Sequence, residues 1–348
     1  MSEEMTSAQL LRQTLSGATP VRPACLCPGG MMNMMTAQIM DLAGVFWPEA
    51  HQDAEAMAQL ASAAYTNGLF DNVGVPFCMT VEAENMGAGV DLGDRYTEPR
   101  VVQYAVESVD QWEELRPLDP TRGRAGTVLE ALKKLRVRCP DAVLMGNLTG
   151  PISLASSLVD AARFYKELFK KPENAHKVLE RVTDGLVAFG LAQIEAGAEF
   201  ITISDPSGTG EILGPKLFGA FALPCLNRLC EELRPHCSGV IVHICGQLQP
   251  IYPQLAQLKC SALSVDAVVN VAQLRKALPG MVVMGNVSTF ALASGNAATI
   301  RTLCQNSLKQ GADILAPACG LGTTTTLESI RLMMEAVRAG EEAPHAAR

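Results

Sequence analysis

The sequence predicts an α/β protein built as a (β/α)8 TIM barrel, with an excursion of the chain over the barrel mouth. Short apolar runs alternate with longer amphipathic segments, eight such runs occur, and small or reactive residues follow nearly all of them. Helices that connect strands act as crossovers, so the strands pair in parallel and eight units indicate a closed barrel. A doubly wound open sheet is the alternative.

The predicted strands are short runs dominated by apolar and β-branched side chains. They span residues 24–27, 75–79, 142–146, 199–204, 239–243, 262–265, 281–285 and 313–316. Apolar residues at helical spacing predict the connecting helices. These span residues 173–196, 214–234, 248–258, 267–277 and 297–310.

Residues suited to chemistry follow the predicted strands. They lie at 80–84, 147–151, 205–208, 243–246, 266, 286–288 and 319–322. In a barrel the carboxyl ends of all strands meet at one face, which is where enzymes of this fold have their active sites. An open sheet would not collect all of these residues around one cavity.

The stretch 84–140 breaks the strand–helix alternation. It contains closely spaced glycines and a charged segment with Pro99, Pro117 and Pro120. We predict strands and loops that pass over the barrel mouth, followed by a helix at 127–138. The whole chain is expected to form one barrel domain at 1–340, followed by a frayed tail at 341–348.

Composition and charge exclude several classes of partner. The chain has 348 residues, 48% of them hydrophobic, and a formal net charge of −8 without a long basic run. Nucleic acid and anionic membrane surfaces are therefore not expected as partners. No apolar stretch reaches the roughly 18 residues that span a bilayer. The acidic start of the chain lacks the features of a signal peptide, so a cytoplasmic location is expected.

The 11 cysteines are odd in number and scattered through apolar segments. In a reducing compartment disulfides are not expected, and most of these thiols should be small buried hydrophobic groups. Cys245 and Cys319 are the exceptions, because each lies just after a predicted strand and precedes a glycine.

A catalytic zinc site is predicted from His243, Cys245 and Cys319. Side chains of a strand alternate between its faces, so His243 and Cys245 point the same way. Cys319 ends the last strand. Three nitrogen and sulfur ligands that leave a position open are typical of catalytic zinc. Asp266, which ends the next strand, is a tentative fourth ligand, or it supports the His243 imidazole by a hydrogen bond.

The ligand at the open position decides what such a Zn2+ ion does. Bound water would serve hydrolysis or deamination, whereas a bound thiol would become a thiolate ready to attack an alkyl group. Two sulfur ligands favour the second use. The deaminase signature, His-x-Glu followed by Pro-Cys-x-x-Cys, is absent from the sequence.

Four further residues are candidates for substrate binding: Glu82, Asn147, Asp205 and Asn286. Each also has a structural alternative. Glu82 suits a solvated or salt-bridged position, Asp205 precedes proline and suits a turn, and the two asparagines suit helix caps. A phosphate-binding Walker loop, a dinucleotide-binding glycine motif and a serine-hydrolase elbow are all absent.

On these residues the chain resembles the methylcobamide:coenzyme M methyltransferase family, within the uroporphyrinogen decarboxylase-like superfamily. The most specific segments are 46–51 (Phe-Trp-Pro-Glu-Ala-His), 75–87, 243–246 and 317–320. The resemblance covers roughly residues 5–338. It implies a barrel that binds zinc through His243, Cys245 and Cys319, with Asp266 where a further acidic ligand would fall. It also implies methyl transfer from the cobalt of a methylated corrinoid protein to a thiol such as coenzyme M.

Other functions stay open within this resemblance. The acceptor could be tetrahydrofolate, or a methyl ether or methylamine could donate its methyl group to Co(I). A non-catalytic barrel that binds metal or corrinoid is the alternative of another class. No Asp-x-His-x-x-Gly cobalamin motif occurs, so the methylcorrinoid is expected on a partner protein. Decarboxylation of a porphyrinogen is disfavoured, because no arginine lies between Pro23 and Arg95.

Overall fold

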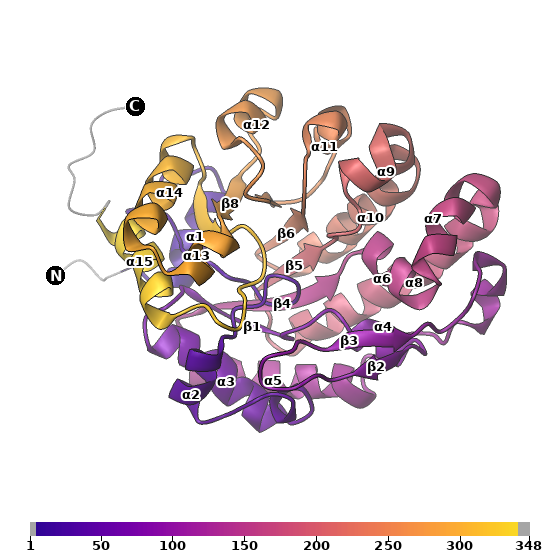
Figure 1. The fold of residues 1–348 in the computed structure, drawn as a ribbon, viewed down its shortest axis with the longest axis horizontal. Helices are drawn as coiled ribbons and strands as arrows, with labels where there is room; N and C mark the ends of the chain where they lie inside the picture. The colour runs from indigo at the N-terminus through magenta and orange to yellow at the C-terminus, as the bar shows by residue number, and fades with distance from the viewer. Residues whose placement is uncertain (1–4, 340–348) are drawn as a thin grey trace.

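A curved parallel sheet forms the centre of the fold in the computed structural model, which describes residues 5–339. The predicted tail at 341–348 lies outside these residues. Seven strands pair in parallel in the order in which they occur along the chain. They are β1 (Asn72–Val75), β4 (Val143–Thr149), β5 (Phe200–Ser204), β6 (Gly239–Ile244), β7 (Ala262–Val265), β8 (Val283–Val287) and β9 (Ile314–Pro317). Figure 1 shows the helices arranged around the outside of these strands.

The predicted first strand, 24–27, occupies the gap between β9 and β1. On one side it forms a parallel bridge between Cys25 and Leu315, and the Leu26 N–H donates to the Leu315 carbonyl at 2.9 Å. On the other side the Asp71 N–H donates to the Cys25 carbonyl at 2.9 Å, and the Asn72 side chain then continues the pairing in place of a longer backbone ladder. Its Oδ1 accepts from the Cys27 N–H at 2.8 Å, and its Nδ2 donates to the Cys27 carbonyl at 2.9 Å. The segment therefore joins the two edges of the sheet, and the predicted barrel is confirmed.

Most predicted strands are confirmed with small shifts, but the one at 75–79 is wrong. β1 begins earlier and ends at Val75, because Pro76 has no N–H with which to continue the ladder. The apolar residues beyond it are buried for another reason. Phe77 and Cys78 pack into the core between the sheet and the helices.

Fifteen α-helices surround the sheet within the described residues. They are α1 (Ser7–Leu15), α2 (Ala37–Ala43), α3 (Ala54–Thr66), α4 (Val81–Asn85), α5 (Gly123–Arg138), α6 (Pro151–Leu158), α7 (Ala161–Lys170), α8 (Pro172–Glu195), α9 (Gly210–Leu217), α10 (Leu223–Leu233), α11 (Tyr252–Leu255), α12 (Val271–Ala277), α13 (Thr289–Ser294), α14 (Ala297–Lys309) and α15 (Leu327–Arg338). None of them is long and apolar enough to cross a membrane.

The predicted helices differ from the structure mainly in their internal form. The predicted helix at 214–234 is helical from Pro215 on, where the second half of α9 continues through a π-helical turn at Phe218–Ala222 into α10. Gly214, with a φ of +64° before Pro215, breaks α9 at the point where the predicted helix begins. The predicted helix at 248–258 is reduced to a 3-10 turn and α11.

The excursion over the barrel mouth is a two-stranded antiparallel hairpin, β2 (Gly89–Asp91) and β3 (Arg100–Gln103). Its connecting loop is tied to the segments that follow the first and last barrel strands. Glu98 accepts a hydrogen bond from Asn33 at 3.1 Å, and Thr323 donates to the Tyr96 carbonyl at 3.2 Å. The predicted helix in this region is α5, which packs against α3 on the outside of the barrel.

Asn72 generates a stability prediction. Replacing Asn72 with Ala should lower the free energy of unfolding by about 2–4 kcal/mol, because the N–H and C=O of Cys27 lose their buried partners. Chemical denaturation followed by circular dichroism measures the loss. The matched control is Asn306→Ala on the exposed surface of α14, with an expected effect within about 0.5 kcal/mol. Equal effects of the two substitutions would contradict the role of Asn72 in closing the sheet.

Candidate metal centre

The structure brings His243, Cys245 and Cys319 together at the barrel mouth. One potential ligand atom from each lies within 4.8 Å of the others. His243 Nε2 is 3.1 Å from Cys245 Sγ, which is 3.8 Å from Cys319 Sγ. His243 is fully buried, whereas both cysteines are half-buried. Among the described residues, no other group of three or more His, Cys, Asp or Glu side chains meets the same criterion.

Close packing of the loops holds this group in place. Gly246 follows Cys245 with a φ of +74°, and a Cβ there would lie 2.7 Å from a carboxylate oxygen of Glu211. Gly320 follows Cys319, and a Cβ there would lie 2.4 Å from the Met31 carbonyl oxygen. At Gly246 the positive φ disfavours a side chain, because the carboxylate end of Glu211 can move aside, whereas at Gly320 a Cβ would displace the backbone of Met31. Backbone conformation therefore favours glycine after Cys245, and packing favours it after Cys319.

The two thiols have opposite electrostatic environments. The hydrogen bond from Cys245 lowers the pKa of the Cys319 thiol, and His243 acts in the same direction against the effect of burial. The pKa of Cys245 is raised by its hydrogen bond to Cys319, by burial and by the nearby Asp266 carboxylate. The two shifts have opposite directions, so Cys319 is the thiol of the pair that ionises first.

The donor set fits zinc. One imidazole nitrogen and two sulfur atoms are ligands that zinc prefers, and three protein ligands are the usual number in its catalytic sites. Cys319 already tends toward the thiolate form in which sulfur binds metals. Both cysteines are also partly exposed, so a further ligand could approach from the solvent side.

Asp266, the tentative fourth ligand, lies outside this group of three residues. Its Oδ2 accepts from the Gly246 N–H at 3.1 Å, and its Oδ1 accepts from the Val268 N–H at 3.2 Å. The carboxylate thus holds the loop that carries Cys245. The hydrogen-bond partner of His243 Nδ1 is Ser264, not Asp266.

Two of the four predicted substrate-binding residues are buried carboxylates that bond to the protein itself. Glu82 accepts from the Thr149 N–H at 2.8 Å and from the Thr149 hydroxyl at 3.0 Å. Asp205 accepts from the N–H and hydroxyl of Ser153, at the start of α6. Burial raises the pKa of both carboxyls. They connect neighbouring strand ends, and substrate binding by either stays a prediction.

The two predicted asparagines also bond to the backbone. Asn147 Nδ2 donates to the carbonyls of Pro28 and Val75, while its buried Oδ1 has no protein partner. Asn286 Nδ2 donates to the carbonyls of Asp266 and Val269. Asn286 thereby fixes the loop after β7, and a substrate role for either asparagine stays a prediction.

Sequence reasoning missed three residues that lie around the site. Ser264 contacts His243, Met32 contacts Ser264, and Glu98 approaches from the hairpin through Asn33. Alternation along strand 262–265 was a usable signal for Ser264, because it places Ser264 on the same face as Asp266. Nothing in the sequence pattern indicated Glu98 or Met32.

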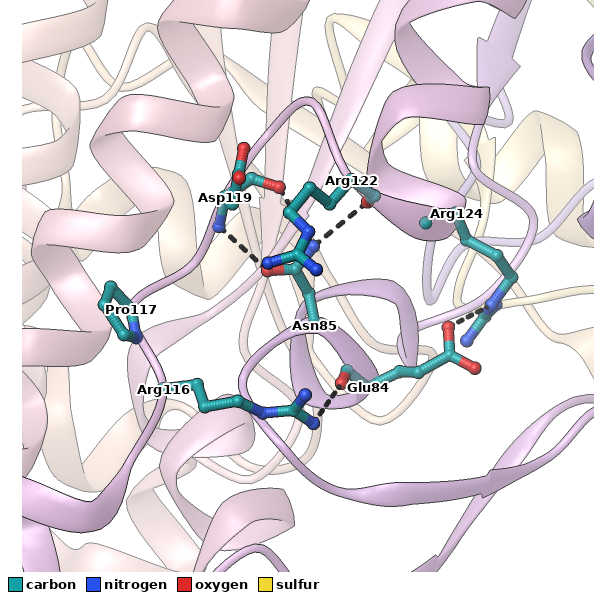
Figure 2. A pocket seen from close by; sticks show the side chains of 8 residues that line it. Glu84, Asn85, Arg116, Pro117, Asp119, Arg122 and Arg124 are labelled. Carbon is teal, nitrogen blue, oxygen red and sulfur yellow. Dashed lines mark hydrogen bonds and ion pairs between the residues drawn. The ribbon is translucent and has the colours of Figure 1, made fainter.

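A separate cavity of about 540 Å³ lies beside α4 and the start of α5. It contains none of the three candidate metal ligands, and Figure 2 shows its arginine-rich lining. Arg124 is buried and bonds to Glu84 at 2.6 Å and to Thr80 at 2.9 Å. Asn85 donates to the carbonyls of Asp119 and Arg122. These bonds fix the loop that precedes α5.

The fold and the site define a class of protein: a parallel barrel with a group of one imidazole and two thiols at its mouth. The family model described as uroporphyrinogen decarboxylase (URO-D) matches residues 6–340. The chain belongs to the URO-D family, and its predicted resemblance to the methylcobamide:coenzyme M methyltransferases within that superfamily is confirmed.

Individual relatives agree with this assignment. The chain is 30% identical to "Methylcobamide:CoM methyltransferase MtbA" of Methanosarcina acetivorans, over 87% of the chain and 90% of the relative. It is 32% identical to "Methylcobamide:CoM methyltransferase MtaA" of Methanosarcina barkeri, over 86% and 88%. A solved structure described as a methyltransferase from Methanosarcina mazei superposes with a TM-score of 0.89 at 30% identity, covering 97% of this chain and 99% of that one.

The opposite pKa shifts of the two thiols predict selective alkylation of the metal-free protein. A lowered pKa keeps Cys319 ionised at a pH where an ordinary thiol, of pKa about 8.5, is protonated. Iodoacetamide at pH 6.5 should therefore modify Cys319 much faster than Cys245, as followed by mass spectrometry of the two peptides. Equal rates that both rise only above pH 8 would show that the thiols are not coupled.

Proposed function

We propose that this protein is a corrinoid-dependent methyltransferase that moves a methyl group from a methylated corrinoid protein to a thiol such as coenzyme M. A zinc ion held by His243, Cys245 and Cys319 would activate the thiol. The observation that carries the proposal is the convergence of these three side chains within 4.8 Å at the mouth of the barrel.

The relatives support both substrates. Two of them are named for a methylcobamide donor and for coenzyme M as acceptor, and the chain covers about nine-tenths of each. A corrinoid is too large to enter a barrel whose interior is filled with side chains, so the donor must be presented at the mouth. The thiols of Cys245 and Cys319 lie at the same mouth of the barrel.

Each residue of the site has a separate task. His243 would bind the ion from the buried side, and the half-buried cysteines would bind it from the side that faces solvent. Zinc, when bound, supplies a positive charge that keeps an added thiol in its thiolate form at neutral pH. Asp266 holds Gly246, and with it Cys245, in position through the hydrogen bond to the Gly246 N–H. Asp266 is also our candidate for a fourth ligand.

The transfer itself exchanges one bond for another. The sulfur of the acceptor thiolate forms a bond to the methyl carbon, and the bond between carbon and cobalt breaks. Both electrons of that bond stay on the cobalt, which leaves as Co(I). The proton of the thiol is released before this step, so none is needed by the leaving group.

Methyl transfer to another acceptor, or in the reverse direction onto cobalt, is the second candidate. Tetrahydrofolate as acceptor, or a methyl ether or methylamine as donor to Co(I), would use the same barrel mouth. Two sulfur ligands favour a thiol partner, because thiolate donation makes zinc a weaker acid toward water. The direct test incubates the zinc-loaded protein and methylcobalamin with coenzyme M or with tetrahydrofolate. Formation of methyl-coenzyme M supports the proposal, and methyltetrahydrofolate alone would replace it with the second candidate.

Cys319→Ser separates an enzyme from a barrel that only stores metal. We expect zinc content to fall well below that of the parent and methyl transfer from methylcobalamin to fall roughly 100-fold or more, because one of three ligands is lost. The matched control is Cys237→Ser. Cys237 is also half-buried and donates to the Gly239 carbonyl, a bond that serine can keep. If Cys319→Ser loses zinc but the parent itself transfers no methyl group to any acceptor, the result would favour the storage role.

A further inference from the structure

His243 lies between two serines in the same layer of the barrel. Ser204 on β5 and Ser264 on β7 are its register partners, so all three side chains point to the same face of the sheet. Both serines are buried. Only Ser264 bonds to the imidazole, with Nδ1 and Oγ 3.0 Å apart, whereas the Ser204 hydroxyl has no partner in the protein.

The second contact of Ser264 favours one direction for the first. Ser264 Oγ is 3.4 Å from Met32 Sδ, and a thioether sulfur can only accept a hydrogen bond. A serine hydroxyl has one proton to donate, so when that proton points at Met32 the oxygen is left as an acceptor toward His243. Nδ1 of His243 then carries a proton, which leaves Nε2 as the ring nitrogen available to a metal.

Nε2 faces the group of candidate ligands, since it lies 3.1 Å from Cys245 Sγ. In neutral imidazole one nitrogen donates and the other accepts, and the bond made by the first nitrogen decides which one can bind a metal. The contact between Met32 and Ser264 therefore influences which nitrogen of His243 is available to bind a metal.

We propose that Met32 and Ser264 are positioning residues that hold His243 in the tautomer with Nε2 free to bind the metal. The importance of this tautomer for zinc rests on the proposed function. Met32 belongs to the methionine-rich segment 31–35, which follows the first strand position, so the contact joins residues 232 positions apart in the sequence. The sulfur of Met32 thereby acts as a hydrogen-bond acceptor as well as a core side chain.

The first test measures zinc affinity by competition with a chromophoric chelator. Ser264→Ala should weaken zinc binding by roughly 10- to 100-fold, the usual cost of losing the partner of a metal-binding histidine. Ser264→Thr keeps the hydroxyl on a strand and should restore affinity to within about threefold of the parent. Ser204→Ala is the matched control, because it removes a buried hydroxyl from the same layer that makes no hydrogen bond to His243. We expect parental affinity for it.

Equal zinc affinity of Ser264→Ala and the parent would overturn the proposal, and so would equal losses in Ser264→Ala and Ser204→Ala. Circular dichroism and the midpoint of thermal unfolding check that each variant folds. If Ser264→Ala does not fold, the comparison passes to Met32→Leu, a substitution that nearly conserves volume and removes only the acceptor sulfur. Met32→Leu should weaken zinc binding by less than Ser264→Ala, since the hydroxyl remains.

The second test needs no metal, so it stands even if the proposed function fails. Nitrogen-15 NMR of the metal-free protein, labelled at histidine, reports which ring nitrogen carries the proton. His243 is assigned by the signal that disappears in His243→Gln. We expect the parent to show protonated Nδ1, and Met32→Leu to show a mixture of tautomers. An Nδ1 without a proton in the parent, or no difference between the parent and Met32→Leu, would overturn the assignment.

Discussion

The structure depends on closing a parallel sheet at one seam. Between β9 and β1 the segment 24–27 forms only a short ladder. Cys25 bridges to Leu315, its carbonyl accepts from the Asp71 N–H, and the side chain of Asn72 pairs with both backbone groups of Cys27. β6 and β9 are separated by two strands in the sheet. Only a curved, closed arrangement can bring the thiol that follows β9 within 3.8 Å of the thiol that follows β6. The candidate metal centre is thus a consequence of the barrel.

The same closure explains why several polar residues at strand ends are buried. Where parallel strands end, backbone groups and helix starts lose their regular partners and need others. Glu82 supplies them for Thr149, Asp205 for the first turn of α6, and Asn286 for the loop after β7. A strand-end carboxylate or amide in a barrel can therefore have a structural task at the same position where a catalytic residue would lie.

Much of the fold and the three candidate ligands could be predicted from the sequence because both depend on local periodicity. Alternation of side chains along 239–246 placed His243 and Cys245 on one face, and the alternation of apolar runs with helical segments predicted the parallel barrel. The strand at 75–79 was misplaced, because buried residues after Pro76 resemble a strand in composition while packing elsewhere. The contacts of Ser264 with Met32, and of Glu98 with Asn33, join distant segments. No local pattern encodes such contacts, so only the three-dimensional structure shows them.

The central claim is that His243, Cys245 and Cys319 together hold one zinc ion. The most direct measurement is the metal content of the protein purified without added metal, before and after treatment with a chelator, by elemental analysis. We expect about one zinc per chain, lost on chelation and regained when zinc is added. A protein that contains no metal, and takes up none when zinc is supplied, would contradict thiol activation at this site.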